Sequence, residues 1–345
     1  MTSYVLLTGG LGYIGSHTAI QLIEKGFQLV IIDNLSNSSL EVLDRIYKIT
    51  KIKPQFELGD LQDPIFLNHV FGKYKISSVI HFAGLKDVTE SLIKPNHYYA
   101  NNVSGSRNLF EAMKNAGVKT LIFSSSANVY GNPLKTPIAE NHPLNPNNPY
   151  GKSKWMVEQI LQDLQNSNSE WKIIILRYFN PVGAHHSGLI GELSTPNSVN
   201  LMSILCKIGL KQDMPIEIYG NDYETLDGTP IRDFIHIDDL ANGHVASLEL
   251  LNKSNSPHDP FIINLGTGKP TTVLQMVQAF ITVTGINIPY HFSQRRKGDI
   301  SISYADPTLA YQTLGWEAKK GIIEMCEDTW RWKLYESNPS KSFDR

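Results

Sequence analysis

Tyr150 and Lys154 stand four residues apart at the start of a helix-forming segment, and this pair could move a proton. Asn148 can cap the helix and Pro149 suits its first position, so both side chains should share one helix face. A phenol near an ammonium, in the first turn where the helix dipole is positive, has its anion stabilised and can act as a base. The alternative is an ordinary surface pair at this spacing, and other motifs must decide.

The segment TGGLGYIG carries Gly9, Gly12 and Gly15 directly after an apolar run. Glycines at this spacing between a strand and a helix allow a tight turn and bring helix N–H groups close to a pyrophosphate. Asp33 ends the second apolar run, where a carboxylate accepts hydrogen bonds from ribose hydroxyls and repels a 2′-phosphate. These residues predict a site for NAD rather than NADP. The alternative is a tight turn followed by a strand that ends in an acid.

Three later strand ends add candidates for this cofactor site. The pair GD at residues 59–60 brings Asp60 towards the adenine, and FAGLK at residues 82–86 can line the same cleft. The run LIFSSSANVYG contains Ser126. Ligands of a doubly wound sheet lie beyond the carboxyl ends of its strands, so we expect Ser126 and Tyr150 to converge on the nicotinamide. A serine beside this tyrosine and lysine suits hydride transfer.

The first half of the chain alternates apolar runs with helical patterns. The runs are YVLL, QLVIID, PQFEL, SVIHFA, KTLIFSS and WKIIILRYF. Helices are expected at 13–25, 40–50, 64–73 and 96–115, and from Tyr150 onwards. Strands that are apolar almost throughout, separated by helices, indicate a parallel sheet covered on both faces. The fold class is therefore α/β, with a Rossmann-type doubly wound parallel sheet.

The second half differs in texture, because loops rich in Pro, Gly and Asn mix with short helical and strand-like pieces after about Phe179. We interpret it as a smaller mixed α/β lobe that binds substrate. Residues 1–180 are assigned to the NAD-binding domain and 181–345 mainly to the substrate lobe. Segments near 233–267 are expected to return to the first domain, since FIINLG reads as another buried strand.

Composition excludes several kinds of partner. The chain has 345 residues, 31 basic and 33 acidic, and a formal net charge of −2, so no surplus of cations is present to bind nucleic acid or an anionic membrane. Cys206 and Cys326 are the two cysteines, which argues against a disulfide framework. No apolar run approaches the roughly 20 residues of a membrane span. We expect a soluble cytoplasmic protein.

Two histidine-containing segments could suggest a metal ion. His236 precedes Asp238 and Asp239, but these acids begin a helical pattern and fit as helix caps and dipole partners. The pair His185-His186 has no third ligand nearby in the sequence. We therefore assign no metal.

Taken with the glycine turn, the serine, tyrosine and lysine resemble the extended short-chain dehydrogenase/reductase family. In that family the tyrosine exchanges a proton with a sugar hydroxyl, the lysine binds the nicotinamide ribose and the serine aligns the hydroxyl. Within it, SSSANVYG, NPYGKSK, LRYFNPVGAH, IRDFIHIDDLA and RRKGD resemble the UDP-glucose 4-epimerases, from the first strand to about Trp316. The resemblance makes Ser126, Tyr150 and Lys154 catalytic. Asn128 stands where that family commonly has threonine, a change expected to leave the chemistry untouched.

The resemblance and the motifs together supply two sets of binding residues. The residues expected to bind NAD, besides Ser126, Tyr150 and Lys154, are Gly9, Gly12, Tyr13, Ile14, Gly15, Asp33, Asn34, Leu35, Ser36, Asn37, Ser38, Asp60, Leu61, Phe82, Ala83, Gly84, Leu85, Lys86, Asn101 and Phe179. The residues expected to bind the UDP-hexose, besides Ser126 and Tyr150, are Asn180, Asn200, Leu201, Arg232, Arg296, Asp299 and Ser303.

Arg232 and Arg296 have independent support, because planar guanidiniums bind the two charges of a nucleoside diphosphate bidentately. Each could instead pair with a neighbouring acid, Asp233 or Asp299. Ser303 stands where the resemblance places the border of the sugar's 2-substituent. A small residue there implies that N-acetylhexosamines are accepted, unless Ser303 faces solvent or a loop fills the gap. The resemblance also implies a homodimer formed through the 96–115 and Tyr150 helices.

The expected activity is reversible epimerisation at carbon 4 of UDP-hexoses through a transient 4-keto sugar. Two alternatives stay open, a sugar-nucleotide 4,6-dehydratase and a non-catalytic NAD-binding regulator. A dehydratase needs an acid and a base after the strand, and this chain has Ala127 and Asn128 there. A net dehydrogenase would need an exchangeable cofactor. A regulator would have no reason to retain Tyr150 and Lys154.

Overall fold

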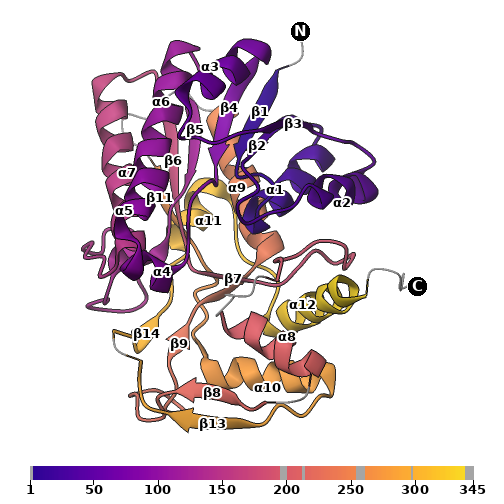
Figure 1. The fold of residues 1–345 in the computed structure, drawn as a ribbon. Helices are drawn as coiled ribbons and strands as arrows, with labels where there is room; N and C mark the ends of the chain where they lie inside the picture. Colours follow the sequence, from indigo (N-terminus) through magenta and orange to yellow (C-terminus); the bar gives the residue numbers. More distant parts are fainter. Residues whose placement is uncertain (1–2, 195–199, 212–213, 254–260, 297, 339–345) are drawn as a thin grey trace.

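The computed structural model describes residues 3–194, 200–211, 214–253, 261–296 and 298–338 (Figure 1). Its centre is a seven-stranded sheet in which every paired strand is parallel. The strands in spatial order are β11 (Phe261–Leu265), β6 (Lys172–Tyr178), β5 (Thr120–Ser124), β4 (Ile76–His81), β1 (Tyr4–Thr8), β2 (Gln28–Asp33) and β3 (Gln55–Leu58). The predicted doubly wound α/β fold is confirmed.

Helices cover both faces of this sheet (Figure 1). One face packs against α1 (Tyr13–Glu24), α2 (Glu41–Thr50), α9 (Ile237–Lys253) and α11 (Thr308–Leu314). The other packs against α3 (Pro64–Lys73), α6 (Gly105–Asn115) and α7 (Pro149–Ser167). Neighbouring strand residues alternate between the two cores, as Leu6 and Leu7 do in β1, which explains why the strands are apolar throughout.

The helix expected at 96–115 is not uniform. It consists of α5 (Pro95–Tyr98), a π-helical turn η1 (Tyr99–Ser104) and α6, and it follows a short helix α4 (Val88–Ile93). In the π turn, Asn102 accepts a hydrogen bond from the Leu85 N–H at 2.8 Å and donates to Ser153 Oγ at 3.0 Å. Apolar periodicity does not reveal a π turn, because one additional residue in a turn barely changes the pattern of a short helix.

A smaller lobe lies beyond the carboxyl edge of the sheet (Figure 1). Its helices are α8 (Leu201–Lys211), α10 (Val273–Thr284) and α12 (Ile322–Ser337), which share a core with β8 (Ile216–Tyr219). The strand β13 (Tyr290–Ser293) pairs with β8. A three-stranded sheet contains β12 (Thr271–Thr272), β9 (Ile231–Arg232) and β14 (Ile302–Ser303). The connection between the lobes includes the paired strands β7 (Asn180–Val182) and β10 (Phe234–His236).

The chain passes between the two lobes several times, as expected, because α9 packs on α1 and β11 pairs with β6 after the chain has visited the smaller lobe. The predicted strand FIINLG is confirmed as β11. The division into residues 1–180 and 181–345 stays a prediction. In the part of the chain that the structure describes, no helix is both long enough and apolar enough to cross a membrane.

The start of α7 depends on Asn148, whose buried side chain accepts a hydrogen bond from the Gly151 N–H at 2.8 Å. We expect Asn148→Ala to lower the free energy of unfolding by about 1 kcal/mol, because the Gly151 N–H in the first turn of α7 loses its hydrogen-bond acceptor. Urea unfolding followed by circular dichroism measures this change. Asn147→Ala is the matched control, since Asn147 is exposed and caps no helix N–H in the described structure. An equal loss in both variants would contradict the capping role.

Candidate active site

The turn between β1 and α1 is closed so tightly that only glycine fits at two positions. Gly9 has φ +66°, and a Cβ there would lie 2.7 Å from the Ala83 backbone nitrogen. A Cβ on Gly15 would lie 2.5 Å from the Gly9 carbonyl oxygen. Among the described residues no side chain caps α1, so its first N–H groups remain available to an anion. The turn has the geometry expected of a phosphate-binding loop.

An open cavity lies beside this turn, at the carboxyl ends of β1, β2, β3 and β4. Its lining contains eleven of the residues predicted to bind NAD: Gly9, Asp33, Asn34, Ser36, Asn37, Asp60, Leu61, Ala83, Gly84, Leu85 and Asn101. Ile32 also lines it and was missed, although its place before Asp33 in QLVIID is a usable signal. The donors, acids and glycines of this lining fit a dinucleotide.

The two acids of this cavity hold the loops around them. Asp33 accepts hydrogen bonds from the N–H groups of Leu11 at 3.0 Å and Leu35 at 2.9 Å, and from Ser38 Oγ at 2.7 Å. Asp60 accepts from Asn34 Nδ2 at 2.8 Å. In the described structure Oδ1 of Asp33 accepts two of these bonds and Oδ2 accepts one, so Oδ2 can still accept from a ribose hydroxyl.

The remaining predicted NAD residues lie outside the lining of this cavity. They are Gly12, Tyr13, Ile14, Gly15, Leu35, Ser38, Phe82, Lys86, Ser126, Tyr150, Lys154 and Phe179. Lys154 nevertheless reaches its edge, because a Cβ on Gly84 would lie 3.5 Å from the Lys154 ammonium. Phe82 and Phe179 directly follow β4 and β6, so they stand at the same edge of the sheet.

Tyr150 and Lys154 are both buried on α7, with exposed fractions of 5% and 4%, which excludes the surface-pair alternative. The Lys154 ammonium donates to the Ser124 carbonyl at 2.9 Å and lies 5.0 Å from the centroid of the Phe123 ring. Ser126 lies two residues beyond Ser124, and its hydroxyl lies close enough to the Tyr150 phenol to lower the pKa of that phenol. The structure thus brings the three predicted catalytic residues together.

The ionisation of this group differs from the expectation. Burial raises the pKa of Tyr150, and the hydrogen bond from Ser126 only partly lowers it. Burial lowers the pKa of Lys154 to about 8, while the Glu158 carboxylate acts in the opposite direction. The expectation that the surroundings favour the phenolate is not met in the described structure, because burial of the phenol outweighs the contribution of Ser126.

Asn128 takes part in the geometry of the site. Its backbone N–H and its side-chain amide both donate to Ser126 Oγ, at 3.2 and 3.1 Å. Two donors on the oxygen leave the Ser126 proton free to point at Tyr150. A Cβ on Gly151 would lie 2.7 Å from the Asn128 carbonyl, so this turn packs directly on the start of α7.

The predicted substrate residues Arg232, Asp299 and Ser303 lie together in the smaller lobe. Ser303 of β14 is the register partner of Arg232 in β9, and Arg232 donates to Asp299 Oδ1 at 2.5 Å. Arg296 is exposed and stacks on the Tyr219 ring, 3.8 Å from its centroid. The alternative ion pairs of Arg232 with Asp233 and of Arg296 with Asp299 do not form among the described side chains. Arg232 instead pairs with the acid from a distant segment, leaving part of its guanidinium available.

Glu192 contacts both the residues predicted to bind NAD and those predicted to bind substrate. It was not identified from the sequence. Its carboxylate accepts from the Lys86 ammonium at 2.6 Å and from Asn200 Nδ2 at 2.8 Å. Lys86 belongs to the NAD set and Asn200 to the substrate set. Asn180 pairs with Phe234 at the lobe connection, and Leu201 begins α8. No motif around Glu192 indicates this role, since it stands in a loop of mixed composition.

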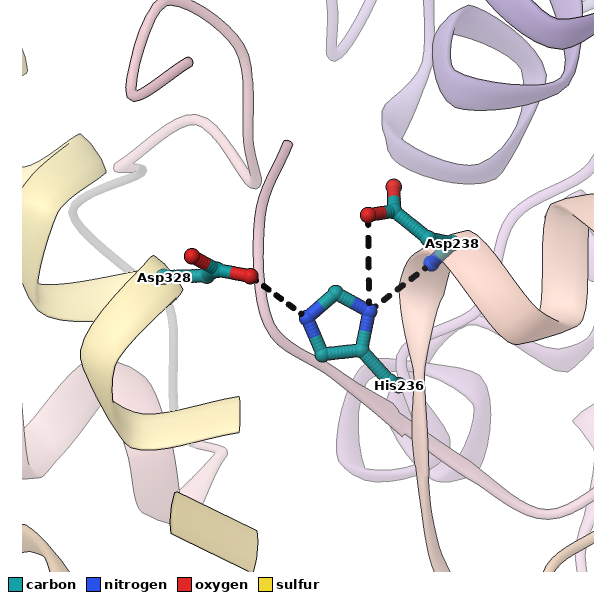
Figure 2. A group of neighbouring side chains, drawn as sticks. All are labelled: His236, Asp238 and Asp328. Carbon is teal, nitrogen blue, oxygen red and sulfur yellow. Dashed lines mark hydrogen bonds and ion pairs between the residues drawn. The ribbon is translucent and has the colours of Figure 1, made fainter. Parts of the chain in front are cut away.

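Figure 2 shows His236 between Asp238 and Asp328, the arrangement closest to a metal site among the described residues. His236 Nδ1 accepts from the Asp238 N–H at 3.0 Å, so Nε2 carries the proton and donates to Asp328 at 3.2 Å. Lys320 donates to both aspartates, at 2.7 and 3.0 Å. Lys320 and Arg331 together balance the charges of the two acids, and both ring nitrogens are engaged, so this cluster is an ion-pair network.

The contacts of Asp239 differ from those expected of a helix cap. Both Asp238 and Asp239 lie in the first turn of α9, where the dipole favours them. The Asp239 carboxylate, however, accepts from the N–H groups of Lys319 and Lys320, at 3.0 and 2.8 Å. It therefore anchors the segment before α12.

Comparison with known proteins agrees with this geometry. The family model described as "NAD dependent epimerase/dehydratase family" matches residues 5–266. The chain belongs to this family. It is 50% identical to the UDP-glucose 4-epimerase of Bacillus subtilis, over 98% of this chain and 99% of the relative.

Two solved structures extend the similarity to the whole fold. The UDP-glucose 4-epimerase of Stenotrophomonas maltophila, with bound NAD and formylated UDP-arabinopyranose, has a TM-score of 0.95 at 43% identity and covers 98% of this chain and 100% of its own. The enzyme of Bifidobacterium longum, in complex with NAD+ and UDP, has a TM-score of 0.92 at 43% identity and covers 99% and 100%. The family therefore extends through both lobes of this chain.

Gly9 provides a direct test of the cofactor cavity. We expect Gly9→Ala to yield folded protein with little bound NAD, because the added Cβ meets the Ala83 backbone and pushes apart the walls of the cavity. The NAD content after denaturation and a thermal melt measure the two properties. Gly26→Ala is the matched control: Gly26 also has a positive φ, +86°, but its added Cβ has open space. Full NAD content in Gly9→Ala would disprove this use of the turn.

Proposed function

We propose that this chain catalyses NAD-dependent, reversible epimerisation at carbon 4 of UDP-hexoses, interconverting UDP-glucose and UDP-galactose. The observation that carries the proposal is the convergence of Ser126, Tyr150 and Lys154 at the edge of a cavity built for a dinucleotide. Membership of the epimerase/dehydratase family along the sheet domain supports it. UDP-galactose formation would place the chain in galactose metabolism.

The cofactor residues would hold NAD with its pyrophosphate at the start of α1 and its adenosine ribose near Asp33. Bound NAD would supply a reversible hydride acceptor for carbon 4, and the sugar would pass through a 4-keto form. The carboxylate of Asp33 disfavours the 2′-phosphate of NADP. Lys154, whose ammonium reaches Gly84 at the cavity edge, would hold the nicotinamide ribose.

Tyr150 would take the proton of the sugar 4-hydroxyl and later give it back. The buried phenol would ionise more readily as positive charge gathers around it, and the Lys154 ammonium on the same helix would contribute part of that charge. Ser126, whose hydroxyl lowers the pKa of Tyr150, would donate to the Tyr150 oxygen and align the sugar hydroxyl. Arg232 and Arg296 would hold the diphosphate, leaving the hexose free to present either face.

Other activities of the same fold receive less support. A 4,6-dehydratase needs an acid and a base beside the serine, where this chain has Ala127 and Asn128, neither of which transfers a proton. A non-catalytic regulator has no use for a buried lysine bonded to the serine turn, which is the segment from Ser124 to Ser126 at the end of β5. A net dehydrogenase would release NADH in proportion to product.

Purified protein supplied with UDP-glucose and no added NAD should form UDP-galactose without releasing NADH. We expect Tyr150→Phe to fold, to retain NAD and to lose this activity by a factor of roughly 10² or more, since the proton-transfer group is gone. Chromatography of the sugar nucleotides measures the conversion. Tyr311→Phe, at an exposed tyrosine, is the control. Near-normal turnover by Tyr150→Phe would remove Tyr150 from the mechanism.

The specificity of the site is proposed to include N-acetylated sugars. Side chains of register partners lie on one face of a sheet, so Ser303 stands beside Arg232, the arginine proposed for the diphosphate. A serine leaves more room than an aromatic ring, and an acetamido group needs several heavy atoms of space.

Ser303→Tyr should suppress interconversion of UDP-N-acetylglucosamine and UDP-N-acetylgalactosamine while largely sparing the plain sugars. Overpacking the site costs roughly 1–3 kcal/mol, or about a tenfold to hundredfold loss in kcat/KM for the acetylated pair. Parallel assays with both pairs give the ratio. Ser301→Tyr, two residues earlier at an exposed position, controls for the bulk of the new ring. Equal loss for both pairs, or no acetylated activity in the unmodified protein, would refute the idea.

The assembly is proposed to be a homodimer formed through the 96–115 and Tyr150 helices. Leu92, Ile93 and Met156 support it, because these apolar side chains of α4 and α7 are 61%, 75% and 44% exposed. A cytoplasmic location is proposed as well. It agrees with Cys206 and Cys326, which are both free thiols.

A further inference from the structure

A buried ion pair lies one helical turn from the proposed chemical centre, which consists of Ser126, Tyr150 and Lys154. Glu158 of α7 and Arg177 of β6 have side chains that are 0% and 2% exposed. Arg177 Nη2 donates to Glu158 Oε2 at 2.6 Å, and Nε donates to the two carboxylate oxygens at 3.1 and 3.2 Å. Nothing in the proposed proton transfer or in the binding of UDP uses either residue.

Glu158 is hydrogen-bonded to the serine turn. It lies one helical turn after Lys154, and its carboxylate accepts a hydrogen bond from Ser125 Oγ. Lys154 donates to the carbonyl of Ser124, the residue before. Two neighbouring groups of α7 therefore hold two successive residues of the turn, and the next residue is Ser126, which contacts Tyr150.

Arg177 extends the same network across the sheet. Its Nη1 donates to Tyr130 Oη at 3.2 Å and to the Glu140 carbonyl at 3.1 Å. Tyr130 in turn donates to Asn264 Oδ1 of β11 at 2.7 Å. The segment after β5, the strand β6 and the strand β11 are thus fixed relative to α7 by one arginine.

An ion pair in this position is costly as a purely structural element. Removing two charges from water costs several kcal/mol per ion, and well-packed apolar side chains of similar volume often give equal or greater stability. An aliphatic pair would fill the space between α7 and β6, where Val157 and Leu161 already pack. It could not hold Ser125 or place a negative charge beside Lys154.

We propose that Glu158 and Arg177 are positioning residues for the epimerisation proposed above: the pair sets the serine turn against α7, so that Ser126 meets Tyr150. The Glu158 carboxylate also favours the charged form of Lys154, against the effect of burial. The other titratable groups that face Lys154 in the described structure are Tyr150 on α7 and His81 on β4. Burial lowers the pKa of His81 to about 3, so His81 stays neutral.

Glu158→Gln tests the inference in the full-length protein that retains its NAD. We expect kcat to fall about tenfold or more, with little change in KM for UDP-glucose or in NAD content. The lining of the NAD cavity and the proposed diphosphate ligands Arg232 and Arg296 lie on elements other than α7. The alkaline limb of the kcat profile should also move to lower pH, since loss of the carboxylate lets Lys154 lose its proton earlier. Asp163→Asn removes the same charge from an exposed position of α7 and should change neither quantity.

A double variant, Glu158→Leu with Arg177→Met, separates positioning from stability. It leaves no unpaired buried charge, so its thermal melt should lie closer to that of the unmodified protein than the melt of Glu158→Gln. We expect its kcat to remain low. Recovery of kcat together with stability, or an unchanged kcat and alkaline limb in Glu158→Gln, would overturn the inference. Absence of epimerisation in the unmodified protein would instead reject the proposed function.

Discussion

The hydrogen bond from the Lys154 ammonium to the Ser124 carbonyl joins α7 to the end of β5, and the arrangement of the chemical centre depends on it. A buried ammonium needs a partner, because desolvation without one costs several kcal/mol. The strand end supplies the oxygen, and the helix must then begin where Tyr150 faces Ser126. The Asn148 cap and Pro149 provide that beginning. The same turn is also held by Glu158, which accepts a hydrogen bond from Ser125 Oγ.

The second constraint is the common edge of a parallel sheet. Gly9, Asp33, Asp60 and Ala83 come from four separate βα connections, yet they line one cavity because their strands run in the same direction. The smaller lobe stands beyond that edge and contributes Arg232 and its neighbours (Figure 1).

The sequence predicted the sheet well because each strand is buried on both faces, so an apolar run marks it clearly. It also predicted the glycine turn, Asp33 and the Tyr150 helix, whose signals are local. It did not predict the partner of Arg232. Sequence neighbours were considered, but Asp233 is engaged by the N–H groups of Thr267, Gly268 and Ala305. Contacts made by chain segments far apart in sequence, like those of Glu192 and Glu158, leave no periodic pattern.

Strand β11 has a consequence for the way this protein is made. It comes from residues 261–265 but completes a sheet whose other six strands end by residue 178. A chain emerging from the ribosome therefore presents β6 as an open, apolar edge while more than eighty further residues are synthesised. Such an edge can pair with another chain until β11 and α9 cover it. The period of greatest risk of aggregation thus falls during synthesis of the smaller lobe.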